Sequence, residues 1–190
     1  IGTGTLTLAS ANSYSGGTLV DAGTLTTDTT GALGTGPASI ASGATLQFGG
    51  KADAGKLAIA NAGTLRLQDT ASAAGATVTN AAGGQVRIDL TTTGTSIGSL
   101  GGAGDVVLGT KTLTTGALGT DNTISGAITG TTGSLVKVGA GTLTLSGTAN
   151  YAGETRVTGG TLKAGATNAF SAASSLSLIH ISEPTRLRRI

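Results

Sequence analysis

The chain has 190 residues, of which 34 are Gly, 11 % are charged and 2 % are aromatic, and its formal net charge is +2. Gly and β-branched Thr are poor helix formers, so this composition excludes a helical bundle. Thr, Val and Ile suit the half-buried face of a sheet, and the 38 % of hydrophobic residues are too regularly spaced for a disordered chain. The sequence therefore predicts an all-β protein.

The sequence contains neither cysteines nor a segment that could anchor it in a membrane. Cys is absent, which excludes a disulfide framework and a thiolate metal site. No apolar run approaches the length of about 18 residues that spans a bilayer, and no basic segment followed by an apolar one opens the chain. We expect no direct membrane insertion, and we expect any export signal or anchor to lie outside these residues.

Apolar positions recur along the chain with a period near twenty. A unit of this length cannot form its own core, but stacked units bury a continuous apolar column. Turns rich in Asn, Asp and Gly precede several of the strands, as expected for coil corners. The period predicts a right-handed parallel β-helix of about nine coils, whose strands are marked by Leu6, Leu25, Leu46, Leu65, Val86, Val106, Ile124, Leu143 and Leu162.

The alternation of apolar and polar residues in each unit predicts which side chains face the interior. We expect Ile88 and Leu90 to point inward from one strand, with Arg87 and Asp89 pointing outward between them. Around Lys137 the same reasoning predicts inward valines on both sides and an outward lysine. Charged side chains are therefore expected on the outer surface.

A longer duplication overlies the coil repeat. Residues 4–25 align without gaps with residues 141–162, and the two tyrosines of the chain, Tyr14 and Tyr151, coincide in this alignment. We expect each tyrosine to brace a corner in its copy. The later copy has Glu and Arg where the first has Gly and Leu, at positions 154 and 156, which leaves the fit of that corner open.

Residues 125–165, SGAITGTTGSLVKVGAGTLTLSGTANYAGETRVTGGTLKAG, resemble the autotransporter-associated β-strand repeat, also called the passenger-associated transport repeat. Residues 29–48 look like the continuation of the first copy. The resemblance implies a pectin-lyase-like β-solenoid belonging to a type V secretion passenger. Its stalk would span residues 1–175, with repeat copies near 1–50 and 125–175.

The resemblance also implies a location and a role. Such a passenger is displayed outside a Gram-negative cell and is anchored by a C-terminal outer-membrane β-barrel of the same chain, which is not present in these residues. We expect a structural stalk that supports export, folding and presentation of a distal adhesin or virulence module. The partner would be a host or neighbouring-cell surface, bound by another region of the protein.

The last fifteen residues differ in composition from all that precede them. Residues 176–190 contain the one His, His180, and three of the eleven basic residues. Their LSLIHISEPTR looks like a translated sequencing adapter, so we expect 176–190 to be an artefact and the natural chain to continue beyond Ser175. The remaining residues hold eight basic and eight acidic side chains, and no nucleic-acid binding is expected.

We predict no catalytic, cofactor-binding or metal-ligating residue and no enzymatic activity. Nucleophilic catalysis by Ser needs a nearby base such as His, and the body of the chain has none. A β-helix polysaccharide lyase or hydrolase is the main alternative, together with a glycan-binding adhesin. Asp69 and Asp89, twenty residues apart, are the carboxylate pair to test for the enzyme.

Two other features have simpler interpretations. We expect Asp89 and Arg87 to form a solvated ion pair, because residues two apart on a strand share a face. A calcium-binding roll requires repeated Gly-Gly-x-Gly-x-Asp nonapeptides. Residues 101–105 approach that motif once, with the Asp one place early.

Overall fold

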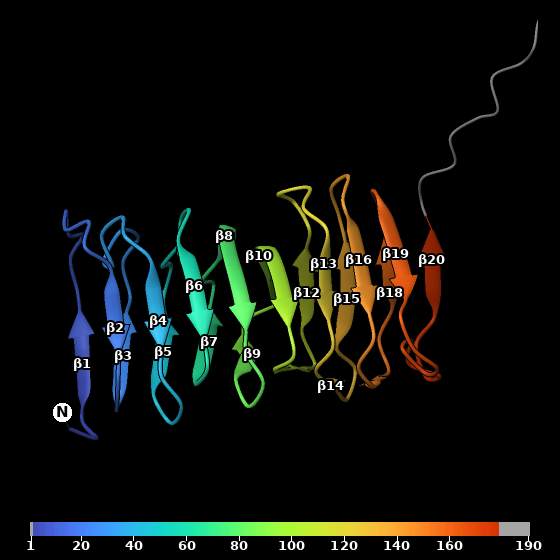
Figure 1. The fold of residues 1–190 in the computed structure, drawn as a ribbon, viewed down its shortest axis with the longest axis horizontal. Helices are drawn as coiled ribbons and strands as arrows, with labels where there is room; N and C mark the ends of the chain where they lie inside the picture. Colours follow the sequence, from blue (N-terminus) through green and yellow to red (C-terminus); the bar gives the residue numbers. More distant parts are fainter. Residues whose placement is uncertain (1, 179–190) are drawn as a thin grey trace, which may run out of the picture.

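The computed structural model describes residues 2–178, which form strands and turns. In Figure 1 the strands lie across a rod that runs from β1 at one end to β20 at the other. Every strand pairing is parallel, and each strand pairs with one that lies about one coil away along the chain. This arrangement confirms the predicted all-β class and the parallel β-helix.

The twenty described strands are short, and most contain three to six residues. In chain order they are β1 (Thr5–Leu8), β2 (Thr18–Val20), β3 (Thr24–Thr27), β4 (Ala38–Ile40), β5 (Thr45–Phe48), β6 (Ala58–Asn61), β7 (Thr64–Asp69), β8 (Ala73–Asn80), β9 (Gln85–Thr91), β10 (Gly94–Gly102), β11 (Asp105–Gly109), β12 (Thr112–Thr115), β13 (Asn122–Ile124), β14 (Ile128–Gly130), β15 (Ser134–Lys137), β16 (Thr142–Leu145), β17 (Ala149–Tyr151), β18 (Thr155–Val157), β19 (Thr161–Ala164) and β20 (Leu176–Leu178).

The cross-section of the solenoid changes at β10. One sheet has eight strands in the order β1-β3-β5-β7-β9-β11-β14-β17. The other sheet divides at β10, because Gly94 at the start of β10 pairs with Thr112 of β12, whereas Gly102 at its end pairs with Ile124 of β13. The early coils therefore contribute two strands each, and the later coils contribute three.

The number of coils is about eight rather than about nine. The first six predicted positions, from Leu6 to Val106, are direct partners in the eight-stranded sheet. After Val106 the partner is Ile128, 22 residues on, and not Ile124. Ile124 lies on another face and pairs with Leu145. The coil after Val106 contains the extra strand β13, so counting apolar positions at a constant period mixed two faces of the solenoid.

A single apolar column fills the solenoid from the second coil onward. Its members come from successive coils, and each packs against the residue one coil away. Full burial of one such aliphatic side chain contributes about 1.5–3 kcal/mol, so the column supplies most of the driving force for folding. The apolar residues of the described chain that are fully inaccessible to solvent are Leu46, Ala52, Leu65, Leu67, Ala76, Val86, Ile88, Ile97, Leu108, Leu113 and Leu135.

A β-bulge in β9 reverses the predicted orientation of Leu90. Past the pair of Arg66 and Arg87 the register shifts, since β9 uses one more residue than β7 before pairing resumes at Leu90. An extra residue in one strand moves the following side chains to the opposite faces. Leu90 is consequently 52 % exposed and Thr91 takes the buried position, so the prediction for Leu90 was wrong.

Lys137 also lies on the opposite side from the prediction. β15 pairs with β12 in a register that places Leu135 beside Leu113 and Lys137 beside Thr115. Because Leu135 is fully buried, the residue two places later also points inward, and Lys137 is 1 % exposed. The alternation was assigned to the wrong phase, since the two valines that flank Lys137 looked more suited to a core than a lysine.

The predicted boundary at Ser175 remains a prediction. Leu176–Leu178 form β20, which pairs with β18 at the end of the rod. The rest of the proposed adapter segment, including His180, lies outside the described residues.

Substitution of a core leucine tests the packing of the column. We expect Leu65→Ala to lower the free energy of unfolding by about 2–5 kcal/mol, because it removes buried methyl groups and leaves a cavity. Leu19→Ala is the matched control, since Leu19 is 69 % exposed. Urea denaturation of both variants would measure the difference. Equal losses in the two variants would contradict the packing described here.

Candidate functional site

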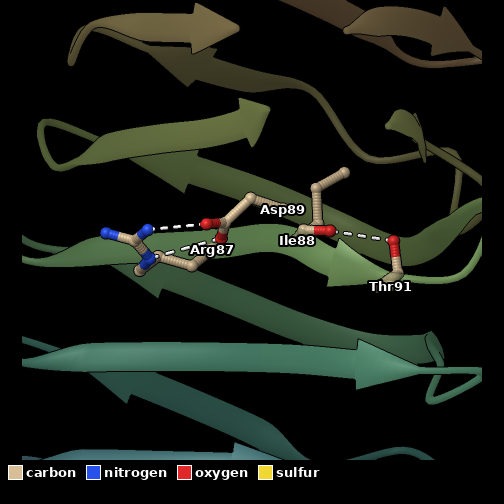
Figure 2. Close-up of polar contacts among 4 residues, drawn as sticks. All are labelled: Arg87, Ile88, Asp89 and Thr91. Carbon is tan, nitrogen blue, oxygen red and sulfur yellow. Dashed lines mark hydrogen bonds and ion pairs between the residues drawn. The ribbon is translucent and has the colours of Figure 1, made fainter. Parts of the chain in front are cut away.

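Arg87 and Asp89 form the one ion pair among the described residues. The two side chains lie side by side on β9, as Figure 2 shows, with Arg87 Nη2 at 2.7 Å and Nε at 3.3 Å from the carboxylate oxygens. In the same view the Thr91 hydroxyl turns back and donates to the Ile88 carbonyl at 2.8 Å, which closes the bulge. The predicted ion pair is confirmed. Because the Asp89 carboxylate is bound to Arg87, it is not free to act as one of the two acids of a glycosidase.

Asp69 does not face Asp89 across the coils. The register shift places Asp69 opposite Thr91, and Asp69 has a positive φ of 55° at the end of β7. Its carboxylate accepts a hydrogen bond from the backbone N–H of Gly50 at 2.9 Å, so it ties one coil to the previous one. The two acids predicted as the pair to test are therefore engaged with different neighbours, Asp69 with a backbone N–H of another coil and Asp89 with a side chain of its own strand.

The single approach to a calcium motif is also a corner contact. Asp105 accepts a hydrogen bond from the backbone N–H of Ala127 at 2.9 Å, one coil further on. Within residues 2–178 no group of three or more His, Cys, Asp or Glu side chains lies close enough together to hold a metal ion. In the same residues no helix is long and apolar enough to cross a membrane.

The loops of two early coils enclose a small pocket with an apolar floor made by Leu33, Phe48 and Leu57. Asp53 and Lys56 are its charged residues. The Asp53 carboxylate accepts a hydrogen bond from the backbone N–H of Gly55 at 2.8 Å. With one carboxylate at the wall, this pocket lacks the second acid of a glycosidase.

Two buried asparagines form a ladder along one corner of the solenoid. Asn61 donates to the side-chain oxygen of Asn80 at 2.7 Å and to the backbone carbonyl of Gln85 at 2.9 Å. Asn80 in turn donates to the carbonyl of Asp105 at 3.0 Å. Both side chains are 1 % exposed. Hydrogen bonds of this kind satisfy backbone groups that a change of direction would otherwise leave unpaired.

Lys137 provides the most unusual chemistry in the described residues. Its ammonium group donates to the carbonyl oxygens of Val138 at 2.6 Å, Gly139 at 2.9 Å and Gly159 at 3.2 Å. Burial lowers the pKa of Lys137 from its ordinary value of 10.5, and the negative charge of Asp121 raises it in part. Sequence reasoning missed this cluster, because only the strand register shows that the lysine points inward.

Tyr14 and Tyr151 each form a hydrogen bond with the threonine four residues later. The Tyr14 hydroxyl lies 2.8 Å from Thr18 Oγ1, and the Tyr151 hydroxyl lies 2.7 Å from Thr155 Oγ1. Each pair joins a residue four places before a strand to the first residue of that strand, and Tyr151 itself ends β17. Tyr14 lies in the first coil and is 39 % exposed, whereas Tyr151 pairs with Gly130 of a preceding coil and is 1 % exposed. The duplicated segments therefore brace equivalent corners, as predicted.

The model of the passenger-associated transport repeat matches residues 1–26 and 135–164. The chain contains passenger-associated transport repeats. A curated relative, the adhesin BmaC autotransporter of Brucella suis biovar 1 (strain 1330), is 35 % identical over 168 residues. The match covers 85 % of this chain and 4 % of the relative, so the chain spans a small part of that protein's length. No solved structure matches the chain.

The two passenger-associated transport repeats are placed partly alike, since β2 of the first and β18 of the second lie along the same sheet. In the first repeat, β1 and β3 pair within the eight-stranded sheet, with Leu6 opposite Leu25. In the second, the equivalent strands β16 and β19 pair within the other sheet, with Leu143 opposite Leu162. The outer strand pair of each repeat thus keeps its pairing but lies on a different sheet, because the later coils contain the additional row β13-β16-β19.

The two substitutions that distinguish the second repeat are accommodated at its corner. Gly17 has a positive φ of 90°, but Glu154 is not among the residues with positive φ, so the turn has a different backbone path. Glu154 is exposed, and its backbone N–H donates to Ser134 Oγ at 3.1 Å. Arg156 is half-buried, and its Nε atom has no hydrogen-bond partner among the described residues.

The buried tyrosine of the second repeat predicts a loss of stability at alkaline pH. Burial raises the pKa of the Tyr151 hydroxyl above its ordinary value of 10.0, and the hydrogen bond with Thr155 lowers it in part. Above pH 10.0 the unfolded chain gives up this proton while the folded chain keeps it. The contribution of Tyr151 is therefore complete below that pH and is lost as pH rises through the folded-state pKa.

We expect the difference in free energy of unfolding between the wild type and Tyr151→Phe to fall as the pH rises from about 9 to about 11. Chemical denaturation at a series of pH values would measure it. Tyr14→Phe is the matched control, since it removes the same kind of hydroxyl contact from the exposed copy. A difference between wild type and Tyr151→Phe that does not change with pH would contradict the prediction.

Proposed function

We propose that this chain is a structural stalk within a type V secretion passenger, which holds a distal module away from a Gram-negative cell surface. The observation that carries the proposal is the unbroken parallel stack. About eight coils share one core, and at about 4.8 Å per coil they form a rod nearly 40 Å long. Because each coil contacts only its neighbours, coils can be added to such a stack without changing the others. This property suits a protein that acts as a spacer.

The family and the relative support the same role. Passenger-associated transport repeats match both ends of the stack, and the relative is named as an adhesin autotransporter. We propose that the parent protein is anchored by a C-terminal outer-membrane barrel and that a host or neighbouring-cell surface is bound by another region. Few exposed aromatic side chains occur in residues 2–178, so the stalk itself offers little of the stacking surface that glycan-binding sites use.

We propose that the chain is not an enzyme. The geometry of a lyase or hydrolase requires acids and bases that converge in one groove. Asp69 and Asp89 instead bind Gly50 and Arg87. Both carboxylates are therefore occupied by contacts within the solenoid. This occupation favours the role of a stalk over that of a β-helix polysaccharide lyase or hydrolase.

Removal of exactly one coil tests the spacer role. Leu46 and Leu65 are successive partners in the same sheet, so deletion of residues 46–64 lets Leu65 stack on Leu25. The chain would be placed between an export signal and an outer-membrane barrel, with an epitope tag upstream. We expect the tag to reach the cell surface at the wild-type level, measured by antibody labelling and protease shaving of intact cells.

Deletion of residues 46–55 is the matched control, because removal of about half a coil destroys the register and exposes the core. We expect that variant to lose most of its surface labelling. If the one-coil deletion lost labelling as fully as the half-coil deletion, the description of the chain as interchangeable coils would be wrong.

A further inference from the structure

We propose that the corner formed by Val138, Gly139 and Gly159 is a binding site for a small monovalent cation, which the chain fills with the ammonium group of Lys137. Three carbonyl oxygens converge on Lys137 Nζ at 2.6, 2.9 and 3.2 Å. None of these three oxygens accepts a backbone hydrogen bond from another described residue. The ammonium group of Lys137 is therefore the hydrogen-bond donor on which these three carbonyl oxygens depend.

The number of donors fits the charged form of the side chain. An ammonium group has three N–H donors and no acceptor, and each donor here reaches a carbonyl. Rings of backbone carbonyls are the ligands that replace the hydration shell of K⁺ in selective pores. Divalent ions favour carboxylate ligands, and none of the oxygens bound by Lys137 belongs to a carboxylate. The site is thus suited to a single positive charge.

The position of Lys137 lets this charge join three coils. Its register partners are Thr115 in the preceding coil and Val157 in the following one. The aliphatic stem passes so close to Gly116 that a Cβ there would lie 3.2 Å from its Cδ and Cε atoms. The ammonium then reaches Gly159 in the next coil. The aliphatic part of Lys137 therefore packs against the preceding coil, and its ammonium group binds the following coil.

The surroundings are polar enough to receive an ion. The Thr115 hydroxyl oxygen is buried and has no hydrogen-bond partner among the described residues, and it belongs to the residue stacked directly beside Lys137. Asp121 adds a negative charge that acts on the ammonium. The neighbouring residues of this inward column, Ile97 beside Thr115 and Val157 beside Lys137, are apolar.

Truncation of the lysine provides the test. Lys137→Ala, made in the full chain, leaves the three carbonyls and removes the cation that they bind. We expect its urea midpoint to be lower than that of the wild type, and to rise with added methylammonium chloride along a one-site curve. At a concentration about ten times its Kd the ligand would raise the folding equilibrium constant about elevenfold. Tetramethylammonium chloride at the same ionic strength is too large for the site and should give no such rise.

Lys163→Ala is the matched control, because Lys163 is an exposed lysine of β19. Its midpoint should respond equally to the two salts. If methylammonium and tetramethylammonium had equal effects on Lys137→Ala, the site would not bind cations and the proposal would be overturned.

A second variant keeps the proposal testable if Lys137→Ala does not fold. Lys137→Met retains most of the length of the stem, so it keeps the packing against Gly116 while it lacks the charge. We expect Lys137→Met to fold with a lower urea midpoint than the wild type, because its three carbonyls remain unpaired. A midpoint equal to that of the wild type would show that the stem alone matters and would overturn the proposal.

Discussion

The structure depends on the contact between each inward aliphatic side chain and its partner one coil away. A coil of about twenty residues cannot enclose a core, so Leu46 is stable inside only because Leu25 and Leu65 cover it on either side. The same parallel pairing satisfies the backbone polar groups of the strands. The corner contacts and the buried lysine join neighbouring coils of this stack.

Corners are the costly part of a solenoid, because the backbone leaves its sheet there and exposes unpaired carbonyls. Buried polar side chains meet this requirement in several ways. Asn61 and Asn80 form a ladder, Thr91 closes a bulge, and Tyr151 bonds the threonine that begins the next strand. Lys137 belongs to the same class, with a charge in place of an amide or hydroxyl.

The two repeats show that sequence similarity and position around the axis are separate properties. The pair of β1 and β3 is matched by the pair of β16 and β19, yet these pairs lie on different sheets because the later coils contain an additional strand. A catalytic cleft that runs along the coils would require its side chains to remain on one face, which the positions of Asp69 and Asp89 do not achieve.

The period of apolar residues and the abundance of Gly and Thr determined the all-β class and the parallel solenoid, because both depend on local chain properties repeated many times. The duplicated segment likewise indicated the passenger-associated transport repeat and the equivalent tyrosine contacts. Only the tertiary structure decided the orientation of Leu90 and Lys137, the number of coils, and the separation of Asp69 from Asp89. Those features depend on which residues pair across neighbouring coils. A single bulge or an added strand changes that pairing, and the alternation of apolar and polar residues in the sequence does not reveal it.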